Sequence, residues 1–162
     1  MKHIVRTLVI ILLAASGVSA ALPYDDGSET TLSVFMVKDM QSEETGYGAA
    51  LSKLDGNMTD LAYMNLGEFT VVEISKLSPK QLGPIDMYFG FATGFAKADS
   101  ESIPGTPDGW LSGLELILGK MNLTSGLSLE LRASSLSSDF DPIAWVSDPD
   151  VFILGAGLSY KF

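Results

Sequence analysis

The chain has 162 residues, of which 20 are acidic and 10 are basic, and its formal net charge is −10. This acidic balance argues against nucleic-acid binding, which depends on Lys and Arg side chains that neutralise phosphates. Cysteine is absent, which excludes disulfides, thiolate metal sites and thiol catalysis. The single histidine is His3, close to the start of the chain.

The first twenty residues have the pattern of a secretory signal peptide. Lys2 and Arg6 precede an almost wholly apolar stretch at 8–18, and small residues follow up to Ala20. A basic start, a short apolar stretch and an A-x-A-like end are typical of such signals, whereas a membrane-spanning helix needs about 20 apolar residues. We therefore expect residues 1–20 to be cleaved, and no cysteine follows them for lipid attachment.

The remainder is predicted to form one domain. Residues 21–30 are polar and acidic and predict a flexible lead-in, which leaves residues 31–162 for the domain itself. No stretch of this remainder approaches the 18 apolar residues expected of a transmembrane helix. If the domain enters a membrane, it must do so as a closed β-barrel, because only helices and closed barrels satisfy every backbone polar group in lipid.

Beyond residue 30 the hydrophobic pattern has a period of two, which predicts β-strands. In the last segment the even-numbered positions from Phe152 to Phe162 are apolar or aromatic, and the odd-numbered positions become small and polar. Asp55-Gly56-Asn57 is a strong tight-turn signal between two earlier strands. The eight predicted strands cover 31–40, 46–54, 58–64, 69–77, 85–97, 110–120, 125–133 and 151–162.

The predicted connections alternate in character. The short ones lie at 55–57, 78–83 and 121–124, and the longer, polar and acidic ones lie at 99–109 and 137–150. Outer-membrane barrels have even strand numbers, short periplasmic turns and longer outer loops. The pattern therefore predicts an all-β fold, an antiparallel up-and-down transmembrane β-barrel with both termini in the periplasm. The connections at 41–45 and 65–68 are short for outer loops.

The last strand carries the most specific signal. Phe162 ends the sequence, and Tyr160, Leu158 and Leu154 precede it in step. This segment resembles the C-terminal strand of bacterial outer-membrane barrels, and the rest of the chain resembles the small eight-stranded OmpA/OmpX-like and opacity-like barrels in architecture. The resemblance implies an outer-membrane location and recognition of Leu154, Leu158, Tyr160 and Phe162 by the barrel-assembly machinery.

Several aromatic residues lie near predicted strand ends, where such barrels carry aromatic girdles at the lipid–water boundaries. These residues are Trp110, Phe152, Tyr160 and Phe162. We therefore expect outer-membrane lipid and lipopolysaccharide as partners, although ordinary β-propensity also places aromatic residues in strands. The alternative fold is a soluble periplasmic β-sandwich or lipocalin-like binding protein. The solvent face of its last strand would carry Lys, Glu, Thr or Asn rather than Ile153, Gly155 and Gly157.

The interior of an eight-stranded barrel is only wide enough for side chains to fill it. We expect small residues on the inward face, namely Gly90, Gly94, Gly113, Gly119, Gly126, Gly155 and Gly157. They would make room for the long charged side chains of Glu73, Glu115, Glu130, Arg132 and Lys161. Because buried charges must pair, we predict a salt-bridge network centred on Arg132 with Glu115 or Glu130. The functional alternatives are a proton or ion path and a catalytic carboxylate pair.

The sequence carries no catalytic pattern. Small barrels that act as lipid A deacylases or palmitoyl transferases use a serine with histidine help, and no histidine follows residue 20. The acidic residues of the two long loops, Asp99, Glu101 and Asp108 in one and Asp139, Asp141, Asp148 and Asp150 in the other, suit at most a weakly bound divalent cation. We therefore expect no enzyme and no cofactor. The predicted role is structural or interactive at the cell surface, with a filled lumen, and the alternative is a narrow pore for ions or small solutes.

Overall fold

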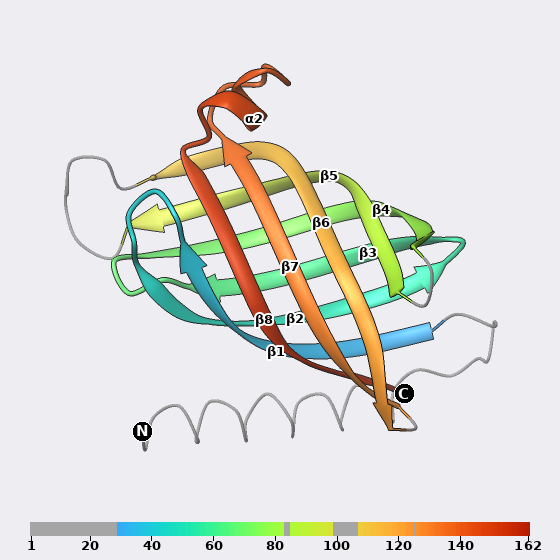
Figure 1. Ribbon diagram of the computed structural model, residues 1–162. Coiled ribbons are helices and arrows are strands. Elements are labelled where there is room, and N and C mark those ends of the chain that lie inside the picture. The colour runs from blue at the N-terminus through green and yellow to red at the C-terminus, as the bar shows by residue number, and fades with distance from the viewer. Residues whose placement is uncertain (1–28, 83–84, 99–106, 125) are drawn as a thin grey trace.

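The computed structural model describes residues 29–82, 85–98, 107–124 and 126–162. The predicted signal peptide at 1–20, most of the lead-in and the loop residues Asp99 and Glu101 lie outside this part of the chain. Eight strands form a closed barrel in which every strand pairs antiparallel with its neighbours in sequence and the last closes on the first (Figure 1). The elements are β1 (Glu29–Asp39), β2 (Thr45–Asp55), β3 (Asn57–Asn65), β4 (Phe69–Leu82), β5 (Ile85–Ala98), β6 (Gly109–Thr124), β7 (Leu127–Ser137), α2 (Ala144–Ser147) and β8 (Val151–Lys161).

The predicted fold class and the number of strands are confirmed, and some boundaries differ. β1 begins at Glu29, inside the predicted lead-in. β4 extends to Leu82, within the connection predicted at 78–83, and β6 extends to Thr124, the last residue of the connection predicted at 121–124. Pro79 favours a break because proline cannot donate to a β-ladder. However, the pairing of β3 with β4 ends at Leu77, so Pro79 lies where β4 has a free edge on that side.

The two ends of the barrel differ. Glu29 and Lys161 lie at one end, which we call the terminal end, together with the tight turns at Gly56 and Gly126. The connections at 40–44, 66–68 and 138–150 lie at the opposite end, which we call the loop end (Figure 1). The inward placement predicted for Gly126 is wrong, because this residue forms the turn before β7 with a φ of 83°, a conformation that favours glycine.

Side chains alternate between the lumen and the outside of the barrel. Along β7, Glu130 and Arg132 are buried, whereas Leu131 between them is 45% exposed. Along β5, Ala92 is buried and Phe91 beside it is 66% exposed. The outward side chains form an apolar band that includes Met36, Leu51, Leu61, Tyr63, Val72, Ile74, Phe89, Phe91, Phe95, Leu131, Leu154 and Leu158. Such a band is expected of a wall that faces lipid rather than water.

The inward side chains form two apolar clusters with polar residues between them. One cluster lies towards the loop end and includes Phe35, Val37, Met64, Leu66, Phe69, Val71, Leu111, Leu136, Val151 and Ile153. The other lies towards the terminal end and consists of Met58, Leu77, Tyr88 and Ile117, with Leu54 against it. On β6, for example, Glu115 lies between Leu111 of the first cluster and Ile117 of the second. Within the described residues, no helix has the length and apolarity to cross a bilayer.

An arginine on the outward face tests whether this wall contacts lipid. Leu131→Arg places a charge near the middle of β7, and we expect it to lower the free energy of unfolding in lipid by about 2–4 kcal/mol. The measurement is urea unfolding in phospholipid vesicles, followed by the fraction of folded protein on an unboiled gel. Ser78→Arg, on the outside near the end of β4, is the control and is expected to cost about 1 kcal/mol or less. Equal stability of Leu131→Arg and the parent protein would contradict a lipid-facing wall.

Candidate functional site

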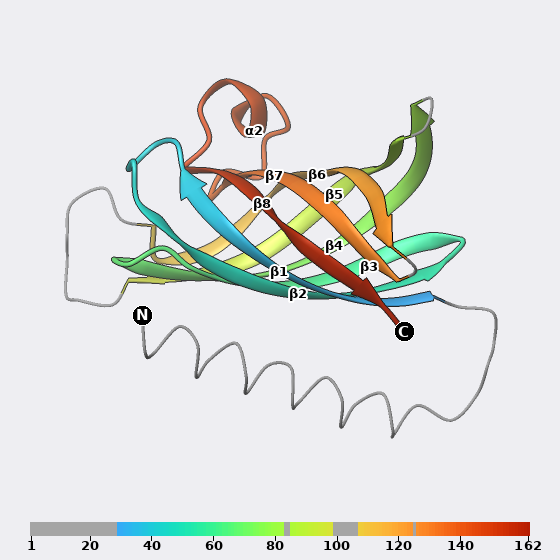
Figure 2. The same cartoon turned by 60° about the horizontal axis from the view of Figure 1, so that its bottom comes forward.

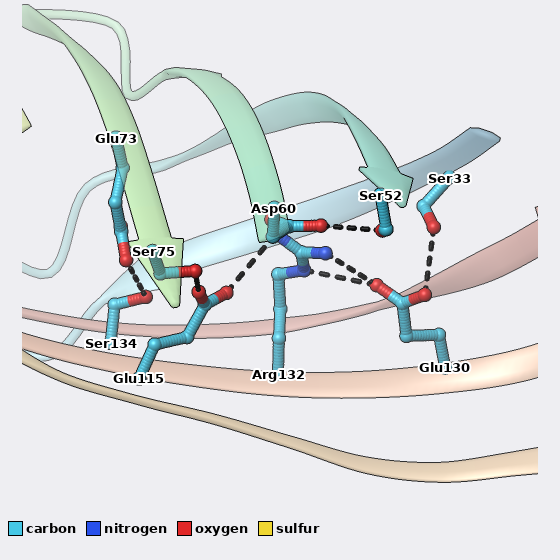
Figure 3. Close-up of polar contacts among 9 residues, drawn as sticks. All are labelled: Ser33, Ser52, Asp60, Glu73, Ser75, Glu115, Glu130, Arg132 and Ser134. Carbon is cyan, nitrogen blue, oxygen red and sulfur yellow. Dashed lines mark hydrogen bonds and ion pairs between the residues drawn. The ribbon is translucent and has the colours of Figure 1, made fainter. Parts of the chain in front are cut away.

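The centre of the lumen is a buried polar layer built around Arg132 (Figure 3). Nη2 of Arg132 lies 2.6 Å from Oε1 of Glu130, and Nε donates to the same oxygen at 3.1 Å. Nη1 lies 3.2 Å from Oδ2 of Asp60 and 3.3 Å from Oε1 of Glu115. One guanidinium therefore ties together carboxylates from β3, β6 and β7 across the inside of the barrel.

Each carboxyl group of the layer also accepts a hydrogen bond from a serine. Ser33 donates to Oε2 of Glu130 at 2.7 Å, and Ser134 donates to Oε1 of Glu73 at 3.2 Å. The remaining pairs are Ser52 with Asp60 and Ser75 with Glu115. We define the polar layer as these residues together with Arg132: Ser33, Ser52, Asp60, Glu73, Ser75, Glu115, Glu130, Arg132 and Ser134.

The charges of the polar layer do not balance when every group is ionised. Among its members Asp60, Glu73, Glu115 and Glu130 are acidic, and only Arg132 is basic. Glu73 forms no ion pair with Arg132, and its Oε2 is buried without a hydrogen-bond partner. Burial of an uncompensated charge costs several kcal/mol. Glu73 is therefore the member of the layer whose negative charge is least compensated.

Glycines make room for the arginine and for the aromatic ring that covers it. The ring of Phe35 lies 4.2 Å from Cζ of Arg132, which is a cation–π contact. A Cβ atom at Gly48 would collide with this ring, and one at Gly157 would collide with the backbone of Phe35. A Cβ atom at Gly155 would lie 2.9 Å from Cγ of Arg132. Small inward residues on β2 and β8 therefore position the guanidinium at the middle of the lumen.

The structure brings together four of the five charged residues that the sequence places in the lumen. Arg132 pairs with both Glu115 and Glu130, and Glu73 lies in the same layer. Asp60 is a member that the sequence analysis does not single out. The sequence does contain a signal for its inward placement, because Asp60 alternates in step with Met58 and Met64 in a predicted strand. All three residues are buried.

The lumen placement predicted for Lys161 is wrong. Its side chain is 49% exposed and forms an ion pair with Glu29 at the terminal end. Lys161 does share the parity of the inward residues of β8, such as Ser159. However, it is the last residue of the strand, so its side chain lies past the closed interior.

The predicted girdle residues lie at both ends of the outer wall. Trp110 and Phe152 each lie at the start of a strand at the loop end, and Trp110 packs edge-on against Phe95 with 5.5 Å between ring centroids. Tyr160 and Phe162 lie at the terminal end, with 5.4 Å between their centroids. Leu154, Leu158 and Tyr160 are exposed on the outside of β8. Recognition of this strand by an assembly machinery stays a prediction.

The acidic residues of the 137–150 loop hold the loop together. Asp150 accepts hydrogen bonds from the backbone nitrogen and the hydroxyl of Ser138, at 2.6 and 2.7 Å. Asp141 accepts one from the backbone nitrogen of Ile143 at 2.9 Å. Across the described part of the chain, no group of three or more His, Asp or Glu side chains has an arrangement that suits a metal ion. Binding of a divalent cation by the acidic loops stays a prediction.

A groove of about 540 Å³ lies on the outer wall. Its apolar lining includes outward residues of β1, β6, β7 and β8, among them Met36, Leu116, Leu131 and Leu154. Because these side chains point away from the lumen, the groove belongs to the lipid-facing surface.

No protein-family model matches the sequence, and no curated protein matches it. Among solved structures, a de novo designed transmembrane β-barrel superimposes with a TM-score of 0.52 at 12% identity, covering 87% of this chain and 100% of the design. The chain has the fold of a transmembrane β-barrel. Neisserial surface protein A, known from a crystal structure, superimposes with a TM-score of 0.42 at 15% identity, covering 83% of this chain and 96% of that protein.

Removal of the central cation tests the polar layer. We expect Arg132→Met to lower the free energy of unfolding by about 3–5 kcal/mol, because it leaves buried carboxylates without their partner. Urea titration in detergent micelles measures the effect. Lys161→Met removes a half-exposed ion pair and serves as the control, with an expected loss of about 1 kcal/mol or less. If the two variants are equally stable, the network does not hold the interior together.

A neutral residue in place of Glu73 should have the opposite effect. Glu73→Gln keeps the acceptor of the Ser134 hydrogen bond and removes a charge that Arg132 does not compensate. We expect the midpoint of urea unfolding to stay the same or rise. Glu130→Gln is the matched control and should lower the midpoint, because Glu130 makes the shortest contact with Arg132. A lower midpoint for Glu73→Gln than for Glu130→Gln would overturn the assignment of the surplus charge.

Proposed function

We propose that the mature protein is a non-conducting outer-membrane barrel with a structural or surface-interaction role. The outer-membrane location is supported by the signal-peptide pattern, the C-terminal strand and the apolar outer wall. The barrel is oriented with both termini in the periplasm, so the terminal end faces the periplasm and the loop end faces the outside of the cell. The partners in the membrane are outer-membrane lipid and lipopolysaccharide.

The observation that carries the proposal is the position of Arg132. Its guanidinium lies inside the barrel and contacts Asp60, Glu115 and Glu130, which come from separate strands. The apolar clusters lie on either side of this layer along β3, β4 and β6. A conducting pore needs a continuous path for water, and a lumen filled in this way supports a closed barrel instead. This argument favours the structural role over the narrow pore.

We also propose that the barrel has no enzymatic activity. The serines of the polar layer donate to carboxylates, and the domain after residue 20 contains no histidine to activate one of them. Asp60, Glu115 and Glu130 are tied to Arg132 inside the lumen, away from a substrate at either surface. We assign contact with other molecules to the connections predicted at 99–109 and 137–150.

In the proposed biogenesis, the assembly machinery recognises β8 through Leu154, Leu158, Tyr160 and Phe162. Leu154, Leu158 and Tyr160 lie on the outer face of β8 and Phe162 directly follows it, so a lipid-side recognition surface is compatible with the closed fold. Recognition would precede the pairing of β8 with β1, which closes the barrel.

Single-channel recording in planar lipid bilayers tests the closed lumen. We expect no steady conductance from purified mature protein, because the proposed closed lumen offers no continuous path for water. The folded state of the same sample is verified by a different migration on SDS gels before and after boiling. Steady, voltage-independent conductance from a sample that is folded by this criterion would establish a pore and contradict the proposal.

A further inference from the structure

We infer that the connection between β7 and β8 is a membrane anchor that inserts apolar side chains among the lipid acyl chains at the loop end. We call residues 138–150 the anchor loop. The inference rests on the membrane location within the proposed function, and it goes beyond that function by assigning a partner to this loop. The sequence alone predicts a polar, acidic segment here.

The anchor loop folds against the outside of the barrel instead of across its mouth. The hydroxyl of Ser135, an outward residue of β7, donates to the carbonyl oxygen of Trp145. The ring of Trp145 packs edge-on against Phe91, with 5.9 Å between the centroids. Phe91 belongs to the apolar outer wall, and in both views α2 lies outside the ring of strands (Figures 1 and 2).

Three large apolar side chains of the anchor loop have no cover within the described chain. Phe140 is 74% exposed, and Ile143 and Val146 are each 73% exposed. Transfer of each such side chain out of water is favourable. Trp145 packs the loop against the lipid-facing wall. The lipid that surrounds this wall therefore also surrounds the exposed side chains of the loop. Lipid acyl chains are therefore their partner.

Several polar groups around α2 already have hydrogen-bond partners within the loop, which favours low-dielectric surroundings. The indole Nε1 of Trp145 donates to the carbonyl oxygen of Asp139 at 3.0 Å. The Ser147 hydroxyl and the Ser147 backbone nitrogen both donate to the carbonyl oxygen of Ile143, at 2.8 and 2.9 Å. Asp148 donates its backbone N–H to Ala144 at 3.0 Å.

The charges of the anchor loop set its depth. Asp139 and Asp141 precede α2, and Asp148 and Asp150 follow it. Carboxylates are costly in hydrocarbon, so both ends of the loop must stay among the headgroups while Ile143 and Val146 between them insert. A short apolar segment with polar flanks and a tryptophan is typical of a helix that lies in the interface and does not cross the membrane.

Depth-dependent quenching of tryptophan fluorescence tests the anchor. The chain has two tryptophans, so Trp110→Phe leaves Trp145 as the only reporter in the full-length mature protein. We expect phosphatidylcholine vesicles with bromines near the headgroup end of the acyl chain to quench Trp145 more strongly than vesicles with bromines at the chain end. Aqueous iodide should quench Trp145 weakly.

A surface variant separates insertion from simple packing against Phe91. Combined replacement Phe140→Ser, Ile143→Ser and Val146→Ser lies outside the barrel wall and should leave the gel-shift of the folded barrel unchanged. In the Trp110→Phe background we expect it to remove most of the bromolipid quenching of Trp145 and to increase iodide quenching.

The reciprocal variant Trp145→Phe reports on Trp110, which lies on the barrel wall. If bromolipids quench Trp110 while Trp145 is reached only by iodide, the barrel is in the bilayer and the anchor is overturned. If bromolipids quench neither tryptophan, the membrane location itself fails. Unchanged quenching of Trp145 in the triple serine variant would also overturn the anchor.

Discussion

The ion pairing of Arg132 is the interaction on which the interior of this barrel depends. An eight-stranded barrel encloses too little space for bulk water, so a charge that points inward must find its partners among other inward side chains. Arg132 finds Asp60, Glu115 and Glu130, and the ring of Phe35 covers its face. The contact with Asp60 joins β7 to β3, a strand that is not its neighbour in the barrel. The absence of side-chain atoms at Gly155 and Gly48 is what allows the arginine side chain and the ring to fit.

The outer wall presents exposed apolar side chains instead of the paired charges of the lumen. They are not buried by other parts of the protein, so packing within the protein contributes little to the stability that they provide. A lipid environment removes them from water without a second layer of protein, which explains how a domain of this size stays folded with a polar centre and no disulfide. The anchor loop extends the same principle to a connection, because Trp145 continues the wall formed by Phe91.

The parts of the structure that follow strand alternation were predictable from the sequence. The inward placement of Glu115, Glu130 and Arg132 depends only on parity within a strand, and parity is visible in residues 110–133. Asp60 obeys the same rule, but it lies in a strand with a weaker pattern, so the sequence does not single it out. Lys161 has the parity of the inward residues of β8, but it lies beyond the end of the closed interior. Alternation along a strand does not show where the lumen ends.

Contacts between distant segments could not be predicted in this way. The position of Trp145 depends on a ring contact with β5 and a hydrogen bond from β7, neither of which leaves a local pattern. α2 has four residues, too few for a helical period to appear in the sequence. The continuation of β4 through Pro79 similarly depends on where the pairing with β3 stops.

The most direct test of the whole account uses the absence of cysteine. Single cysteines at Leu129, Leu131 and Ala133, on the outer face of β7, can each carry a nitroxide spin label without a competing thiol. In phospholipid vesicles we predict that all three labels collide freely with oxygen, which concentrates in lipid, and are shielded from a water-soluble nickel complex. Ready collision of the nickel complex with the label at Leu131 would show that water covers this wall and would contradict a transmembrane barrel.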